Sequence, residues 1–174
     1  SNICYLLHKK AKAHGLSEDI TIPEDVKLLI IPDAGTNDVT QCTELVSRGV
    51  QIVILDHHEK EESEIKMPEE VVIVNNQCSP RYRNKDLCGA GIVYRFLQAM
   101  DDELWINYAD DYLDLCALAN IGDVMDMRSF ETRRLVNKGI RSIQNECLKA
   151  LIQAQDYSMH SICLLYTSPS PRDR

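Results

Sequence analysis

Lys27-Leu28-Leu29-Ile30-Ile31-Pro32-Asp33 and Val50-Gln51-Ile52-Val53-Ile54-Leu55-Asp56-His57-His58 are the two runs that predict the fold. Each is apolar almost throughout, as expected for a strand of a parallel sheet that is covered on both faces. Between them, apolar residues recur at helical spacing from Val39 to Val46, and Gly49 suits the left-handed position after a helix. The pattern predicts a right-handed βαβ unit with two neighbouring parallel strands.

The same pattern extends in both directions along the chain. Residues 71–74 are predicted to form a third strand, which ends at Asn75 and Asn76, and residues 3–7 are predicted to form a fourth. From Gly89 onward, apolar residues recur at helical spacing over 92–100, 112–119, 135–143 and 148–151. The predicted fold class is α/β, a mainly parallel sheet flanked by helices and followed by a helical segment.

Composition bounds the class of protein. The chain has 174 residues, of which 44% are hydrophobic and 26% charged, and this excludes a disordered tail and a coiled-coil rod. No apolar run approaches the ~20 residues that span a bilayer, so we expect no membrane partner. Seven scattered cysteines without a C-x-x-C pair indicate reduced thiols in a cytoplasmic protein rather than a disulfide framework.

The net charge of -8 argues against a protein coated with positive charge for holding duplex DNA. It does not exclude a phosphate substrate, because bound divalent cations can supply positive charge.

Polar residues follow these two predicted strands. Asp33 follows the first, and Asp56, His57 and His58 follow the second. Ligands of open parallel sheets bind at the carboxyl ends of the strands, and a carboxylate with an imidazole suits Mn²⁺ or Mg²⁺. Asp33 as a turn residue, Asp56 as a cap and a surface histidine explain the same residues. From these residues alone, the metal site and the structural interpretation are equally open.

Four motifs stand in a fixed order along the chain. They are Pro32-Asp33-Ala34-Gly35, Asp56-His57-His58, Gly89-Ala90-Gly91 and Gly122-Asp123. Together they resemble the DHH phosphoesterase superfamily, and in detail the RecJ-like single-strand-specific exonucleases. The similarity runs from about Ile3 to Asn145, and it includes the stretches 31–38, 75–80, 113–118 and 121–126.

The resemblance implies a role for each matching acidic or histidine residue. Asp33 corresponds to a carboxylate that bridges two metal ions, and His57 and Asp123 correspond to ligands of one of these ions. Asp56 corresponds to a residue that orients an imidazole, and His58 to a histidine that faces the scissile phosphate.

Substrate contacts are implied for a second set of residues. The backbone of Gly89, Ala90 and Gly91 would approach a phosphate at a helix N-terminus. Arg81 precedes them in a loop with Arg83 and Lys85. Contact with a phosphodiester backbone and ordinary solvated charge are equally open interpretations of these three cations.

The implied activity is 5′-to-3′ hydrolysis of single-stranded DNA in repair and recombination, through a water that bridges two Mn²⁺ or Mg²⁺ ions. No stable protein partner is expected. Two alternatives stay open. One is a related phosphodiesterase for oligoribonucleotides, cyclic dinucleotides or pyrophosphate, and the other is a non-catalytic binding module whose site has decayed.

The family has an Asp-x-Asp-Gly motif and a second domain that do not occur in this sequence. We therefore interpret residues 1–160 as a partial DHH phosphoesterase domain, and residues 161–174 as a non-native tail that resembles translated adapter sequence. Such a chain is expected to bind metal weakly and to be inactive alone.

Other polar residues are interpreted as solvated surface charge. For Asp101, Asp102, Asp110, Asp111 and Asp114 on helices, the alternative is an N-terminal charge favoured by the helix dipole. For His8 and His14, with Lys9, Lys10 and Lys12 after the first apolar run, the alternative is contact with a nucleic-acid strand.

Overall fold

The computed structural model describes residues 3–8, 14–17 and 20–154. The predicted tail at 161–174 and the three lysines at positions 9, 10 and 12 lie outside the described residues. The chain divides into two compact units, residues 1–81 and residues 82–174, and each is described by itself.

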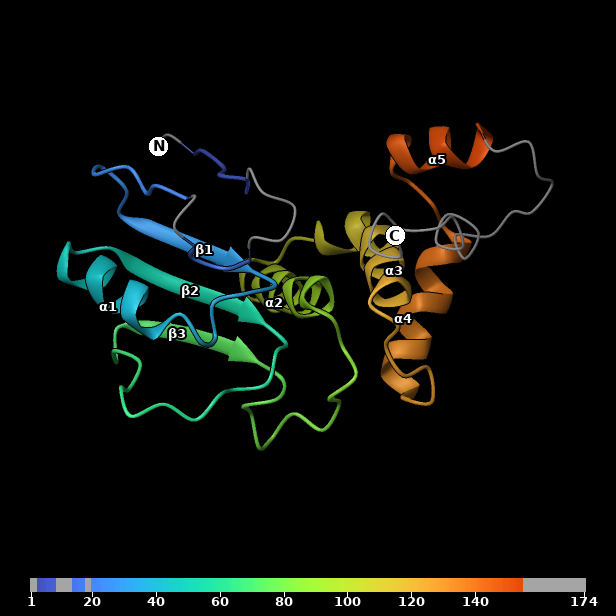
Figure 1. Ribbon diagram of the computed structural model, residues 1–174. Helices are drawn as coiled ribbons and strands as arrows, with labels where there is room; N and C mark the ends of the chain where they lie inside the picture. Colours follow the sequence, from blue (N-terminus) through green and yellow to red (C-terminus); the bar gives the residue numbers. More distant parts are fainter. Residues whose placement is uncertain (1–2, 9–13, 18–19, 155–174) are drawn as a thin grey trace, which may run out of the picture. The chain divides into compact units, whose positions relative to one another are not determined.

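The first unit is built on a three-stranded parallel sheet (Figure 1). Its strands are β1 (Leu28–Pro32), β2 (Gln51–Asp56) and β3 (Val71–Asn75), in the order β1-β2-β3. Helix α1 (Val39–Ser47) connects β1 to β2. These elements confirm the predicted α/β class and the predicted βαβ unit, because a helical crossover joins two parallel neighbours.

One face of the sheet forms the core of this unit. Ile31 of β1 and Ile54 of β2 are register partners on that face, where they join a buried cluster with Cys42 and Leu45 of α1. Successive strand residues point to opposite faces, so the neighbouring Leu28 and Ile30 point away from α1 and are 53% and 51% exposed. Within the first unit, the described residues therefore cover only one face of β1.

The predicted fourth strand at residues 3–7 was also wrong. These residues are described and have no strand structure, and Ile3 and Tyr5 are 93% and 85% exposed. An apolar run becomes a strand only when a neighbour completes its ladder of backbone hydrogen bonds, and local sequence does not specify that neighbour.

Helix α1 ends as the sequence indicated, but it does not begin with the side-chain cap that Asp38 could supply. Gly49 follows it with φ of +80°, the conformation that favours glycine after a helix. Asp38 is the residue before its first turn, but its carboxylate does not cap the helix. It accepts a hydrogen bond from the backbone N of Leu16 at 2.7 Å instead, and this bond ties the loop at residues 14–17 to the start of α1.

The second unit is helical. It contains α2 (Gly89–Leu104), a 3₁₀ turn η1 (Ala109–Tyr112), α3 (Leu113–Gly122), α4 (Phe130–Arg141) and α5 (Glu146–Gln153). These elements cover the four predicted helical segments except residues 142 and 143, which follow the end of α4. Among the described residues, none of the helices is both long enough and apolar enough to cross a bilayer.

Asp114 lies in the first turn of α3, as one of the two interpretations held, but it is not a solvated charge. It is buried, and its Oδ2 accepts hydrogen bonds from the backbone N of Gln144 at 2.8 Å and of Asn145 at 2.7 Å. The carboxylate thus binds the turn between α4 and α5 to the first turn of α3. This role could not be predicted from the local hydrophobic pattern, because the partners lie some 30 residues away in sequence.

Gly139 lets α4 approach α3 closely. A Cβ at this position would overlap the backbone oxygen of Leu113 and would lie 2.5 Å from the Cβ of Ala117. We therefore expect Gly139→Ala to lower the free energy of unfolding by about 2 to 3 kcal/mol, because the two helix backbones must separate. Urea denaturation followed by circular dichroism measures this loss. The control is Asn137→Ala on the exposed side of α4, and equal stability of the two variants would contradict the close approach.

Candidate metal centre

Asp33 begins the site at the carboxyl end of β1. Its backbone N donates to the oxygen of Leu55 at 2.8 Å, which extends the pairing of β1 with β2 by one residue. The chain then turns sharply, with Asp33 at φ of +60°. Aspartate tolerates this left-handed conformation better than most residues, and such outliers occur often at functional sites. Its carboxylate is 56% exposed and open to a ligand.

Asp56 organises the loop that follows β2. It is buried, and its Oδ1 accepts hydrogen bonds from the backbone N of His57 at 2.7 Å and from Nδ1 of His58 at 2.7 Å. Burial by itself would raise the pKa of Asp56, but hydrogen bonds from Thr36 and His58 outweigh burial and lower that pKa to about 2. The carboxylate is therefore ionised at neutral pH.

The imidazole that Asp56 orients is that of His58. An ionised carboxylate only accepts hydrogen bonds, so Nδ1 of His58 carries the proton and Nε2 is left for a ligand. His57 contacts Asp56 through its backbone N, and its own ring points to Asp33, with Nε2 3.3 Å from Oδ1 of Asp33.

Two residues that were not predicted to belong to the site, Thr36 and Asn75, hold the ends of the three strands together. The backbone N of Thr36 donates to Oδ2 of Asp56 at 3.1 Å. The side-chain amide of Asn75, at the end of β3, donates to Oγ1 of Thr36 and to the backbone oxygen of His58, both at 2.9 Å. Thr36 and Asn75 are buried, so this network is shielded from water. The available signal was the polar Asn75 directly after an apolar strand.

Asp33, His57 and His58 form the one group of potential metal ligands among the described residues, with ligand atoms within 4.8 Å of one another. His57 is largely buried and Asp33 is exposed, so the group opens to solvent on the carboxylate side. A carboxylate oxygen with imidazole nitrogens and no thiolate fits Mn²⁺, and the oxygen also suits Mg²⁺. The donors present therefore fit a divalent cation.

His14 is a further residue beside this group. Its ring meets the ring of His58 edge to face, with centroids 4.9 Å apart. The following Gly15 has φ of +65°, and a Cβ there would collide with the carboxylate of Asp38. His14 was expected to be a surface charge, whereas the turn anchored by Asp38 brings it to the site.

The other predicted site residues are described within their own units. Asp123 is exposed at the carboxyl end of α3, in the second unit. Gly89, Ala90 and Gly91 form the first turn of α2. Gly91 is buried there, and a Cβ would press on Leu87 and Asn120. Arg81 is exposed in the loop after β3. The roles of these residues stay predictions.

The class of protein follows from a family comparison. Residues 1–120 match the model of the DHH family, N-terminal domain, and the chain belongs to this family.

The chain is also similar in sequence to individual exonucleases. The chain is 44% identical over 158 residues to YorK of Bacillus subtilis strain 168, whose name describes a prophage-derived single-strand DNA-specific exonuclease. It is 26% identical over 160 residues to the single-stranded-DNA-specific exonuclease RecJ of Thermus thermophilus. These matches cover 91% and 88% of the chain but only 26% and 23% of the two relatives, so the chain spans about a quarter of their length.

A solved structure shares the fold. The crystal structure of RecJ in complex with Mn²⁺ from Thermus thermophilus matches 81% of this chain and 21% of its own, with a TM-score of 0.69 and 24% sequence identity.

Proposed function

We propose that this chain forms part of the catalytic core of a metal-dependent phosphodiesterase, a 5′-to-3′ exonuclease for single-stranded DNA in repair and recombination. The observation that carries the proposal is the group of Asp33, His57 and His58 at the carboxyl ends of neighbouring parallel strands. Membership of the DHH family and the names of YorK and RecJ support the reaction and the substrate.

Each residue of the group would have a different role in hydrolysis. Two bound Mn²⁺ or Mg²⁺ ions would polarise the phosphoryl group and lower the pKa of a water. Asp33, whose carboxylate has two oxygens, would hold both ions, and His57 would hold one of them. Asp56 holds His58 through Nδ1. With a proton also on Nε2, the ring of His58 would donate to a non-bridging phosphate oxygen and stabilise negative charge there.

We extend the proposal to residues of the second unit and the loop before it. Asp123 would be a further carboxylate ligand of the ion that His57 binds. The amides at the start of α2, from Gly89 to Gly91, would hold a substrate phosphate, since the first amides of a helix have no intrahelical acceptor. Arg81 would contact the phosphodiester backbone.

The experiment replaces the matching segment of YorK with this chain, which at 44% identity offers a related framework. We expect this chimera to release 5′-mononucleotides from a 3′-labelled single-stranded oligonucleotide with Mn²⁺ and to stop when EDTA removes the metal. Cleavage of only short oligoribonucleotides or cyclic dinucleotides would contradict the DNA substrate. Binding of Mn²⁺ without cleavage of any of them would contradict the enzyme and indicate a binding module.

A further inference from the structure

Helix α4 has one buried side and one basic side. Thr132, Leu135, Val136 and Gly139 are buried. The opposite side carries exposed residues at helical spacing, which we call the α4 basic face: Phe130, Arg133, Arg134, Lys138 and Arg141. The helix has four basic residues and one acidic residue, in a chain whose net charge is -8. The positive charge of α4 thus lies on one side of the helix.

The one acidic residue of α4 does not neutralise this face. Glu131 accepts hydrogen bonds from Tyr82 at 2.8 Å and from Asn84 at 3.1 Å, and it also pairs with Arg95. These contacts turn its carboxylate toward the loop before α2. Desolvation and the hydrogen bond to Glu131 raise the pKa of Tyr82 to about 12, so the phenol stays a donor to this carboxylate.

Two cations of the face are available for a ligand. Lys138 forms an ion pair with Asp110 at 2.7 Å. In the part of the chain that the structure describes, neither Arg134 nor Arg141 has an ion pair. They are seven residues apart, which is about two helical turns, or roughly 10 Å along the axis. That spacing suits contacts with separate phosphates of one strand.

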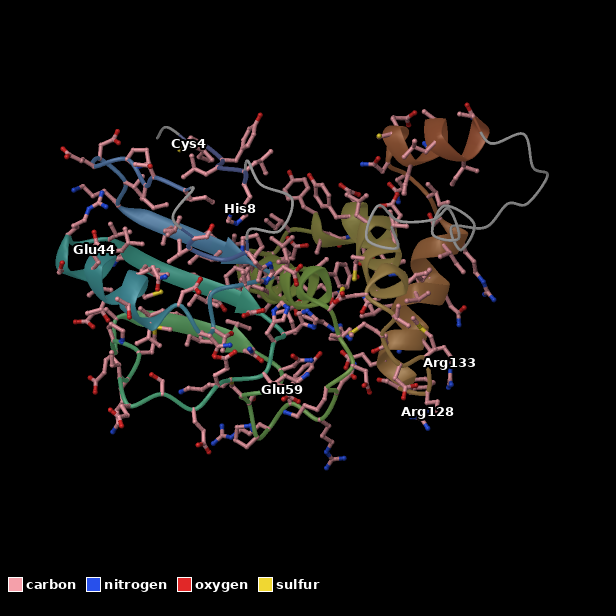
Figure 2. All side chains as sticks on the ribbon, in the orientation of Figure 1. Cys4, His8, Glu44, Glu59, Arg128 and Arg133 are labelled. Carbon is pink, nitrogen blue, oxygen red and sulfur yellow. The ribbon has the colours of Figure 1, made fainter. Side chains whose placement is uncertain are left out.

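Phe130 adds an aromatic ring to the face. It is 70% exposed at the first position of α4, and the guanidinium carbon of Arg133 lies 5.9 Å from the centre of its ring. Figure 2 shows Arg133 and Arg128 at the same end of α4. An exposed ring beside guanidinium groups can stack on an unpaired base while the cations hold the backbone.

We propose that the α4 basic face binds single-stranded nucleic acid, with phosphates at Arg134 and Arg141 and a base stacked on Phe130. This inference rests on the proposed function, because it gives the same substrate a second contact surface. Charge complementarity favours a polyanion, and the exposed ring favours one with unpaired bases over a duplex or an acidic protein.

The test measures binding of the 174-residue chain to fluorescent oligothymidylate by anisotropy, in EDTA and low salt. Arg134→Glu with Arg141→Glu should weaken binding by at least about 10-fold and reduce the dependence on salt. The control, Lys27→Glu with Lys66→Glu, makes the same change in net charge at exposed positions of the first unit and should bind like the wild type. Equal binding by wild type and the Arg134→Glu, Arg141→Glu variant would overturn the proposal.

A second variant tests the ring. Phe130→Ala should weaken binding of oligothymidylate about fivefold or more, but should leave binding of an abasic oligonucleotide of equal length unchanged. Equal losses with both ligands would overturn the stacking contact, and competition by polyglutamate as strong as that by oligothymidylate would assign the face to an acidic protein. Because these measurements use EDTA, they do not depend on metal-dependent cleavage. The binding result and the cleavage result can therefore each be negative while the other is positive.

Discussion

Asp33→Asn should lower the affinity for Mn²⁺ and the rate of metal-dependent hydrolysis by at least about 100-fold, with the fold retained. The carboxylate lies 3.3 Å from Nε2 of His57 and is the only acidic member of the ligand group in the described part of the chain. An amide keeps the shape but presents a neutral oxygen to the cation, and its nitrogen is a donor. The ligand group then carries no negative charge to offset the positive charge of a divalent cation.

At this position asparagine tests the metal ligand more specifically than alanine does, because Asp33 has a left-handed backbone conformation. Asp33 has φ of +60°, and asparagine tolerates that conformation, whereas alanine there costs about 1 kcal/mol of strain. Asp33→Ala would therefore mix a loss of ligand with a loss of stability. Asp33→Asn separates the two effects.

Metal binding can be followed by the electron paramagnetic resonance signal of free Mn²⁺. Hydrolysis can be measured as cleavage of the oligonucleotide by the YorK chimera. The matched control is Asp25→Asn, the same change at an exposed aspartate before β1, which should affect neither quantity. Turnover of Asp33→Asn at the wild-type rate would remove Asp33 from the role of metal ligand.

Asp56→Ala should destabilise the first unit by roughly 3 kcal/mol. The buried carboxylate accepts bonds from Thr36, His57 and His58, so alanine leaves several donors without an acceptor. The loss should also lower Mn²⁺ affinity by about 10- to 100-fold, because the rings of His57 and His58 lose the carboxylate that orders their loop.

Hydrogen exchange measured peptide by peptide suits this variant better than fluorescence. The single tryptophan, Trp105, is 94% exposed in the second unit and would not report on Asp56. We expect faster exchange in β1, β2 and β3, while peptides of α3 and α4 serve as the internal reference. Asp126→Ala is the matched control, since Asp126 also accepts several hydrogen bonds, all from the exposed Arg128. Equal protection of β2 in Asp56→Ala and wild type would contradict the role of this network.

Local pattern was enough for most elements of the fold. The apolar run before Pro32 and the helical spacing from Val39 to Val46 predicted β1 and α1 to within one or two residues. The order of these elements then predicted a parallel pair, because a helical crossover has one favoured handedness. Asp33 and the Asp56-His57-His58 tripeptide were predicted at the same edge of the sheet, where β1 and β2 place them.

The roles of residues with partners far away in sequence were not predicted correctly from the local sequence pattern. The run at residues 3–7 has the composition of a strand but no strand structure. Asp114 has the position of an exposed helix charge, yet it binds backbone amides of residues 144 and 145. His14 meets His58 across more than forty residues of sequence. Periodicity reports which face of an element is apolar, and it carries no information on which remote group will meet a particular polar atom.

The α/β class, the parallel pairing of the first two strands and the acidic and histidine residues at their ends could all be predicted before any coordinates. These features follow from hydrophobic periodicity and chain order, which are local properties. The folded structure was needed to show that Asp56 orients His58, that Asp33 adopts a left-handed turn facing His57, and that Thr36 and Asn75 join the three strand ends. Such contacts depend on strand register and loop closure, because hydrogen bonds form only where the folded chain brings donor and acceptor within about 3 Å.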